Sequence, residues 1–330
     1  MVKNISNLLL WSNALAGGGG GGGGDTPSGG EEWIGDGNTH IWVSLSEGRT
    51  SLGLGVYPNG TVTVDWGDGS TPDVLTGTGS LKRTPVHNYA SAGDYVITLT
   101  VDGTLAIKGA GGNSYSYLVN TTGIGAQLID CCALNSIKKI ELGGGVSNLG
   151  EYALGECRSL KRVRISNGVT NIGERAFYGC SALEAISVPN SVATIGKSAF
   201  YECSSLEEIN LPDGITDIGS YMCYACHALK SINIPNGVIT IGNNAFHICR
   251  AVSKVSISKN VTSIAASAFA SMYSCAWYDF TQHTAVPTLA HTSAFTGIPA
   301  DCEIRVPAAL VDEWKAATNW ATYADKIVGV

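Results

Sequence analysis

The residues of this chain that most resemble a reactive site form the pentapeptide "CYACH", residues 223–227. A Cys-x-x-Cys-His sequence attaches haem in c-type haem proteins, and a Cys-x-x-Cys pair alone is typical of thiol redox chemistry. Both chemistries require sulfur atoms that a ligand or a substrate can reach. The elements that carry Cys223, Cys226 and His227 therefore decide whether the pentapeptide is reactive.

The chain repeats itself at a constant period from residue 137 onward, as three adjoining segments show: "LEAISVPNSVATIGKSAFYECSS" (183–205), "LEEINLPDGITDIGSYMCYACHA" (206–228) and "LKSINIPNGVITIGNNAFHICRA" (229–251). A fixed period of roughly 20–29 residues with one short strand per repeat predicts a solenoid, whose stacked repeats bury continuous apolar columns. One column is aromatic except at Cys223, and another is cysteine in five consecutive repeats: Phe177, Phe200, Cys223, Phe246 and Phe269; Cys157, Cys180, Cys203, Cys226 and Cys249.

These columns predict a structural role for "CYACH". Cys226 belongs to the cysteine column, Cys223 replaces a phenylalanine, and His227 takes a polar surface position. A free cysteine packs as a small apolar residue, and a filled solenoid interior has no room for haem. A redox-active pair remains the alternative. Disulfides between successive coils are also compatible with a spacing of about 4.8 Å, although a ladder of parallel free thiols is simpler.

The repeat pattern L-x-x-I-x-I-P-x-x-V-x-x-I-G-x-x-A-F-x-x-C-x-x-L resembles BspA-like leucine-rich repeats, and we assign residues 137–300 to such repeats. The resemblance implies a solenoid that serves as a binding scaffold. Residues 301–330 predict a strand at Glu303–Val306 and a helix that together cap the open end of the core. Residues 120–136 are expected to form the junction and the N-terminal cap.

Two sets of residues repeat on the outside of the predicted solenoid, and both are candidate binding surfaces for a host protein or glycan. One set follows the phenylalanine column and either contacts a ligand or packs between coils. The other set points outward from the strands, as either a binding face or a plain solvated surface. The candidates are Tyr178, Tyr201, Tyr224 and His247 in the first set, and Arg164, Ser187, Asn210 and Asn233 in the second.

Residues 39–119 alternate apolar and polar residues between turn signals, which predicts a β-sandwich. The segments "VDWGDGS" (64–70), "HNY" (87–89) and "GDYVITL" (93–99) resemble the PKD domain, an immunoglobulin-like sandwich. That resemblance implies a spacer or a contact module for proteins and glycans. Asp65 and Asp68 are candidate Ca²⁺ ligands, but a turn held by their side chains is favoured, because Ca²⁺ takes about 6–8 oxygen ligands.

The N-terminus consists of a short apolar segment and a glycine-rich stretch. Residues 1–16 predict an anchoring helix, and residues 17–38, with eight consecutive glycines, predict a flexible tether. A degenerate export signal is the alternative for residues 1–16. A short helix before polyglycine resembles the start of some bacteriophage virion proteins, which implies attachment to other virion proteins. The anchor residues would be Ile5, Leu8, Leu9, Trp11 and Leu15.

The composition excludes several functions. The net charge is −7 and only 14% of residues are charged, which argues against a nucleic-acid partner. No apolar stretch reaches the roughly 18–20 residues of a membrane span. The sequence has no Gly-x-Ser-x-Gly, phosphate-loop or His-Glu-x-x-His motif. We therefore expect no enzyme activity, no cofactor and no metal.

The sequence thus predicts a mainly β protein: a PKD-like or immunoglobulin-like β-sandwich followed by a leucine-rich-repeat solenoid with a C-terminal helical cap. The favoured function is a surface-displayed binding or adhesion protein, a bacteriophage tail or capsid-decoration component that contacts a host surface. The alternatives are a secreted or cell-surface bacterial adhesin of the BspA type, and a structural virion assembly protein. Self-association into a homo-oligomer stays open.

Overall fold

The computed structural model describes residues 33–45, 51–54, 57–78, 85–107 and 136–330. The five anchor residues of the predicted N-terminal helix lie outside the described residues. So do residues 17–32 of the tether, residues 120–135 of the junction, and the neighbouring Cys131 and Cys132.

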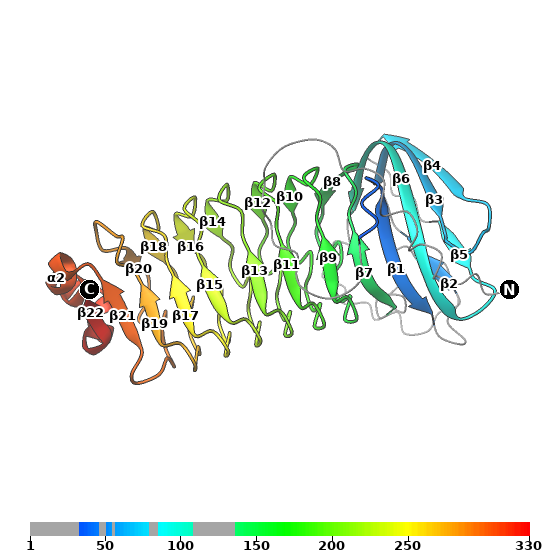
Figure 1. Cartoon of the computed structure of the whole chain (residues 1–330). Helices are drawn as coiled ribbons and strands as arrows, with labels where there is room; N and C mark the ends of the chain where they lie inside the picture. Colours follow the sequence, from blue (N-terminus) through cyan, green and yellow to red (C-terminus); the bar gives the residue numbers. More distant parts are fainter. Residues whose placement is uncertain (1–32, 46–50, 55–56, 79–84, 108–135) are drawn as a thin grey trace, which may run out of the picture. The chain divides into compact units, whose positions relative to one another are not determined.

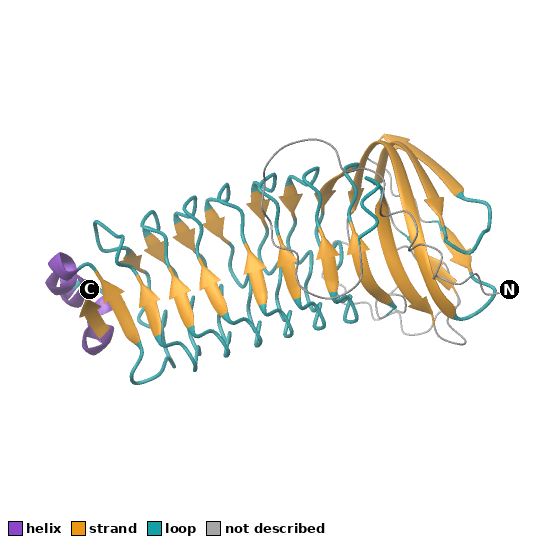
Figure 2. Ribbon diagram, viewed as in Figure 1, coloured by secondary structure: helices purple, strands orange, loops and turns teal. Residues whose placement is uncertain are grey.

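The described chain is mainly β, as predicted, and its helices are confined to the C-terminal end (Figures 1 and 2). Residues 39–107 form six strands: β1 Thr39–Leu45, β2 Ser51–Gly53, β3 Tyr57–Asp65, β4 Asp73–Thr78, β5 Val86–Asn88 and β6 Gly93–Ile107. Strands β4, β3, β6 and β1 pair antiparallel in that order, while β2 and β5 form a separate pair. Trp66, Val62, Val64 and Ile97 are buried in this region. The resemblance to the PKD domain stays a prediction.

The repeats form two rows of parallel strands, which Figure 1 shows as two rows of arrows and which we call ladders. Strand pairing is interrupted once in each ladder, between residues 208–210 and 231–233 in one and between residues 194–195 and 217–218 in the other. The long-strand ladder contains β7 Ile137–Glu141, β9 Arg162–Arg164, β11 Ala185–Ser187, β13 Glu208–Asn210, β15 Ser231–Asn233, β17 Lys254–Ser256, β19 Trp277–Asp279, β21 Glu303–Val306 and β22 Ile327–Gly329. The short-strand ladder contains β8 Val146–Leu149, β10 Asn171–Ile172, β12 Thr194–Ile195, β14 Asp217–Ile218, β16 Thr240–Ile241, β18 Ser263–Ile264 and β20 Thr288–Leu289. The predicted solenoid is therefore confirmed.

The register of the ladders follows the sequence period until the last coil. Ile186 pairs with Ile209 in the long-strand ladder, exactly one repeat further on. The partner of Ile264 is Leu289 and the partner of Tyr278 is Ile304, and both partners lie beyond the position that the constant period predicts. After Met272 the repeat pattern of the sequence fades and is matched only at Val286-Pro287 and Ala294-Phe295, and the structure shows there a coil with inserted residues. It ends in β21, the helix α2 Val311–Ala316, and the 3₁₀ turns η2 Ala308–Leu310 and η3 Trp320–Lys326.

Strands β1 and β6 connect the N-terminal strands to both ladders. They pair with each other, β1 pairs antiparallel with β7, and β6 pairs parallel with β8. One sheet of 11 strands therefore runs from the N-terminal region into the first coils. Since an uncovered solenoid end exposes unpaired backbone groups and core residues, β1 and β6 act as a cap on the first coil.

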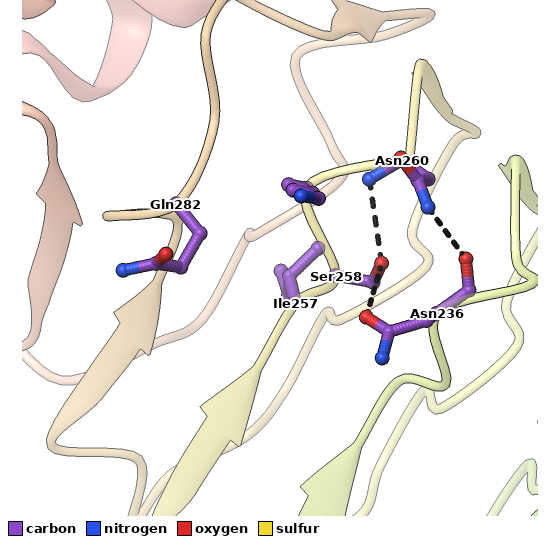
Figure 3. Close-up of a pocket in the computed structure, with 6 residues that line it drawn as sticks. Asn236, Ile257, Ser258, Asn260 and Gln282 are labelled. Carbon is purple, nitrogen blue, oxygen red and sulfur yellow. Dashed lines mark hydrogen bonds between the residues drawn. The ribbon is translucent and has the colours of Figure 1, made fainter.

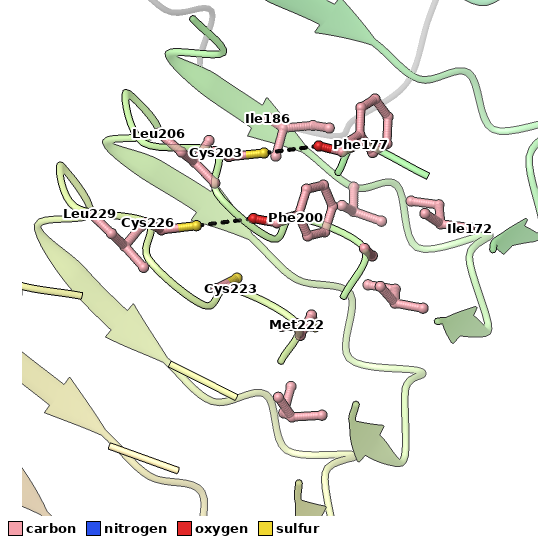
Figure 4. Packing of buried hydrophobic residues seen from close by; sticks show 14 of the residues in the cluster. Ile172, Phe177, Ile186, Phe200, Cys203, Leu206, Met222, Cys223, Cys226 and Leu229 are labelled. Atoms are coloured by element: carbon pink, nitrogen blue, oxygen red, sulfur yellow. Dashed lines mark hydrogen bonds between the residues drawn. The ribbon is translucent and has the colours of Figure 1, made fainter. Parts of the chain in front are cut away.

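The cysteine column is held by thiol hydrogen bonds to the preceding coil. The Sγ–H groups of Cys203 and Cys226 donate to the carbonyl oxygens of Phe177 and Phe200, both at 3.2 Å (Figure 4). Cys180 and Cys249 make the same bond to their preceding coils. Burial raises the pKa of Cys180, Cys203 and Cys249 well above its ordinary value, so these thiols stay protonated. The cysteines that the structure describes are all free and buried.

Positions 222 and 223 hold a large side chain followed by a small one, whereas the neighbouring coils hold a small side chain followed by a large one. The two coils on either side of this one hold alanine and phenylalanine at these positions, and the rings of Phe177 and Phe200 stack with centroids 5.3 Å apart. In this coil Met222 is fully buried in place of the alanine, beside the small Cys223 (Figure 4). Tyr221 is 40% exposed and does not fill the core. The methionine therefore occupies the volume that the missing phenyl ring leaves.

Each coil before the last one also contains two residues with positive φ at fixed repeat positions, and most of them are not glycine. One of these positions holds Gly179 in one coil and Ile248, with φ of 65°, in another. A left-handed backbone costs about 1–2 kcal/mol for a residue with a Cβ atom, and it is rare for a β-branched residue. The coil geometry thus imposes strain at Ile248 that Gly179 avoids.

The reversed order of large and small side chains predicts that substitutions at positions 222 and 223 have non-additive effects on the free energy of unfolding. Cys223→Phe should lower the free energy of unfolding by about 1–3 kcal/mol through overpacking, and Met222→Ala by about 2–4 kcal/mol by opening a cavity. The double variant restores the alanine and phenylalanine pair, and should unfold within about 1 kcal/mol of the wild type in urea. Additive losses in the double variant would show that the two side chains do not share one space.

The backbone strain predicts that glycine is more stable than alanine at position 248, the reverse of the usual order. Ile248→Gly and Ile248→Ala lose nearly the same side-chain contacts, but only alanine keeps a Cβ atom in the left-handed conformation. The glycine variant should therefore be more stable by about 1 kcal/mol in urea unfolding. The control is Ala185→Gly in β11, where glycine should cost about 0.5–1 kcal/mol. A less stable glycine variant at 248 would contradict the strain.

Candidate functional site

The pentapeptide "CYACH" lies on the inner wall and rim of one coil. Cys223 and Cys226 are fully buried, and the Cys226 thiol is engaged with Phe200. His227 is exposed, with its Nδ1 atom 3.1 Å from the carbonyl oxygen of Ile248. Within the described part of the chain, no three His, Cys, Asp or Glu side chains gather in a metal-binding group. Because the sulfur atoms face a packed core, the geometry favours the structural interpretation of the pentapeptide.

The tyrosines of the first candidate set form a stack across the coils. The ring centroids of Tyr178 and Tyr201 are 4.9 Å apart and those of Tyr201 and Tyr224 4.7 Å, with interplanar angles of 9° and 7°. Tyr152 extends the row at one end, and His247 meets Tyr224 edge-on at the other, 5.3 Å away. Burial lowers the pKa of His247, which favours a neutral ring.

This stacking limits what the tyrosine row can bind. A sugar that binds an aromatic ring needs an open ring face, and the faces of Tyr201 are covered by Tyr178 and Tyr224. All three rings are partly buried. The geometry therefore favours packing between coils for this set, and leaves ring edges as its exposed surface.

The "WGDG" turn is built from side-chain to backbone hydrogen bonds. Asp65 accepts the N–H of Gly67 at 2.9 Å and Asp68 that of Ser70 at 3.0 Å. Asp68 also accepts a hydrogen bond from His87 at 2.7 Å, and His87 stacks on the buried Trp66 with centroids 5.0 Å apart. Three of the four carboxylate oxygens that would be offered to a Ca²⁺ ion thus accept hydrogen bonds in the turn.

The same bonds set the acidity of Asp68. Partial burial acts to raise its pKa, but hydrogen bonds from Ser70 and His87 outweigh this effect and lower the pKa to about 2. A lowered pKa in the folded state means that the carboxylate stabilises the turn above the ordinary pKa near 4. This contribution is lost as the pH falls from about 4 toward 2.

The second candidate set lies on the outer face of the long-strand ladder. Arg164, Ser187 and Asn210 occupy one row, because each pairs in register with the next. Asn233 holds the equivalent place on β15, and all four side chains are exposed. Along a strand every second residue points to this face while its neighbours fill the core. The structure therefore brings this set together as one polar surface.

The N-terminal end of this face is covered by the chain itself. The Lys139 ammonium lies 4.3 Å from the ring centroids of both Trp33 and Trp42. Glu141 accepts the N–H groups of Ile34 at 3.0 Å and Gly35 at 3.4 Å. Residues 33–35, which the sequence assigns to the tether, are thus docked on β7.

The C-terminal end of the face carries an aromatic residue that sequence reasoning missed. Trp277 lies in register between Lys254 and Glu303, and is partly exposed. The Arg305 guanidinium lies 5.0 Å from its ring centroid and bonds Glu303 at 2.7 Å. The signal was present in the sequence, because Trp277 follows Lys254 by one period, but the fading of the pattern after Met272 concealed it.

Parallel strand ladders, an aromatic column and apolar columns at a constant period define a leucine-rich-repeat solenoid. The chain belongs to the family described as BspA type leucine rich repeat region, whose model matches residues 122–251 and 170–296 and counts six copies. No curated protein matches the chain. No helix among the described residues is long and apolar enough to cross a membrane.

Several solved structures are similar. A leucine-rich repeat protein of T. pallidum is 26% identical, with a TM-score of 0.45, covering 49% of this chain and 78% of that one. One from Eubacterium ventriosum is 23% identical, with a TM-score of 0.45, covering 49% of this chain and 42% of that one. A leucine rich cell surface protein of Faecalibacterium prausnitzii is 18% identical, with a TM-score of 0.31, covering 61% and 65% of the two chains.

The tyrosine stack predicts a loss of stability on truncation. Tyr201→Ala removes two ring contacts, each worth about 0.5–1.5 kcal/mol, and should lower the free energy of unfolding by about 1–3 kcal/mol. Tyr273→Ala is the matched control: its ring is 58% exposed, and its removal should change the stability by less than about 0.5 kcal/mol. Equal unfolding midpoints for both variants in urea would show that the stack does not bind the coils together.

Proposed function

We propose that this protein is a non-enzymatic, surface-displayed binding protein that contacts a host-surface protein or glycan through the outer face of its long-strand ladder. The observation that carries the proposal is the row of exposed polar side chains that starts at Arg164 and continues through Ser187, Asn210 and Asn233. Leucine-rich-repeat proteins of the BspA type are typically located at the cell surface or secreted.

The physical properties of this face suit recognition. Its backbone is fixed by hydrogen bonds to both neighbouring coils in most of the ladder, so a partner meets a scaffold that needs little ordering on binding. Short side chains such as Ser187 and Asn210 lose little rotamer entropy when they are covered. Trp277 with Arg305 adds the residue types that most often dominate binding energy.

The place of display is a second part of the proposal. Residues 1–16 would attach the protein to other virion proteins, with residues 17–32 as the tether, so that the repeats project from a tail or capsid. A secreted or cell-surface adhesin of the BspA type is the first alternative, and a structural assembly protein of the virion is the second. Intact-mass measurement of the purified protein separates the first two, because export by cleavage removes residues 1–16.

The binding face can be tested with beads coated with the full chain and incubated with panels of bacterial and epithelial cells. The double variant Asn210→Arg/Asn233→Arg places bulky cations in the row and should lower bead attachment at least tenfold. The control Ala193→Arg/Ile239→Arg adds the same charges at exposed positions beside the short-strand ladder, and should bind as the wild type does.

Two results would overturn the proposal. Equal attachment of the wild type and the Asn210→Arg/Asn233→Arg variant would remove the long-strand face as the binding surface. Absence of attachment of the wild type to every cell type, with the protein folded by circular dichroism, would contradict an adhesive role and favour the assembly alternative.

A further inference from the structure

The last coil contains a two-residue insertion directly after its long strand. Three residues (258–260) separate the core residues Ile257 and Val261, whereas five (281–285) separate Phe280 and Val286 one coil further on. The inserted loop is held from inside by His283, which is 4% exposed and places Nδ1 3.2 Å from the carbonyl oxygen of Phe280. The loop is therefore longer than its counterparts and fixed in position.

Beside this loop lies a shallow, open depression of about 370 Å³, formed by the turns of three successive coils (Figure 3). Its shape is maintained by hydrogen bonds between neighbouring turns. The side chain of Asn260 donates to the carbonyl oxygen of Asn236 at 2.8 Å, and the hydroxyl of Ser258 donates to the side-chain oxygen of Asn236 at 3.4 Å. The lining residues are Asn236, Ile257, Ser258, Lys259, Asn260 and Gln282.

Several polar groups of the depression remain available to a ligand. Among the described residues, no hydrogen bond engages the side-chain nitrogen of Asn236, the side-chain oxygen of Asn260 or the amide of Gln282. Asn236, Asn260 and Gln282 are exposed. These neutral amides offer both donors and acceptors, while Ile257 provides an apolar contact.

This combination matches the chemistry of a neutral saccharide, whose hydroxyl groups both donate and accept hydrogen bonds. A phosphate group would require several converging cations, and Lys259 is the single cation in the lining. A purely apolar ligand would require an enclosed apolar pocket. Trp277 begins the strand that leads to the loop, about 10 Å before Phe280 at about 3.3 Å per residue. Its partly exposed ring can therefore stack a further sugar unit.

We propose that this depression is a carbohydrate subsite, which binds the end of a neutral oligosaccharide while Trp277 stacks a neighbouring unit. The inference rests on the proposed binding function and adds to it a ligand class and a location. It also moves the aromatic contact from the stacked tyrosines to Trp277, for which no ring-to-ring contact is found among the described residues and which has Arg305 beside its ring.

The test uses the full chain and immobilised chitotriose, cellotriose, maltotriose and N-acetyllactosamine in biolayer interferometry. We expect measurable binding of at least one of these, and a loss of tenfold or more in affinity for Asn236→Ala/Gln282→Ala. The control Asn190→Ala/Asp213→Ala removes polar side chains from the same repeat position in coils without the insertion, and should retain wild-type affinity. Trp277→Ala should weaken a trisaccharide more than its monosaccharide.

Each outcome bears on the inference separately from the proposed function. Binding to cells without binding to any of the four saccharides overturns the inference and leaves the adhesive role intact. Saccharide binding that survives Asn236→Ala/Gln282→Ala, or that is lost equally in the Asn190→Ala/Asp213→Ala control, also overturns it, because the depression would then not be the site. Unfolding midpoints of all variants confirm that a loss of binding is not a loss of fold.

Discussion

Backbone pairing between successive coils is the constraint on which the rest of this structure depends. Parallel strands fix each residue directly above its equivalent in the next coil, at about 4.8 Å. Each side chain must therefore pack against the side chain at the equivalent position of the next coil. Flat rings satisfy this by stacking, as Phe177 and Phe200 do inside and Tyr201 and Tyr224 do outside. Cysteine meets this requirement because its thiol donates a hydrogen bond to a carbonyl oxygen of the preceding coil, as Cys226 does to Phe200. A residue of another size is accepted only with a neighbour that compensates for it, as Met222 does for Cys223.

This constraint explains how much of the fold the sequence predicts. Strict equivalence between coils leaves a constant period in the sequence, and from it the core columns and one strand per repeat follow. The strand Glu303–Val306 is predicted from its own segment, whereas the second, shorter strand of each coil is not predicted. Structural features that differ between coils, or that lie outside them, leave no periodic pattern in the sequence. The pairing of β1 with β7 joins segments that are distant in the sequence and share no repeat, so no periodicity reveals it. The insertion at 281–285 weakens the repeat pattern within the predicted repeats 137–300, and the structure shows that this coil accommodates it as a longer loop. Whether Tyr201 shows its face or its edge also depends on ring geometry, which the spacing does not determine.

The two ends of the long-strand face differ in a way that bears on function. At the N-terminal end the chain covers the face with its own residues, and uses the charge of Glu141 for two backbone N–H groups and for Arg164. At the C-terminal end Trp277 is partly exposed, and the amides of Asn236, Asn260 and Gln282 on the neighbouring turns are exposed. The regular coils between these ends form a rigid scaffold, and the irregular last coil adds residue types that the regular coils lack at these positions. The family scaffold thus sets the framework, and departures from the repeat set what is displayed on it.

The cysteine column bears on the redox conditions under which this protein can fold. Four of its cysteines need a hydrogen on sulfur, because that hydrogen bonds a carbonyl oxygen of the coil before: Cys180, Cys203, Cys226 and Cys249. Folding of the repeats thus requires neither an oxidase nor an isomerase, and a reducing cytosol serves as well as an oxidising exterior. The core around Cys180, Cys203 and Cys249 is therefore the same in both compartments, since these buried thiols stay protonated and are shielded from oxidants.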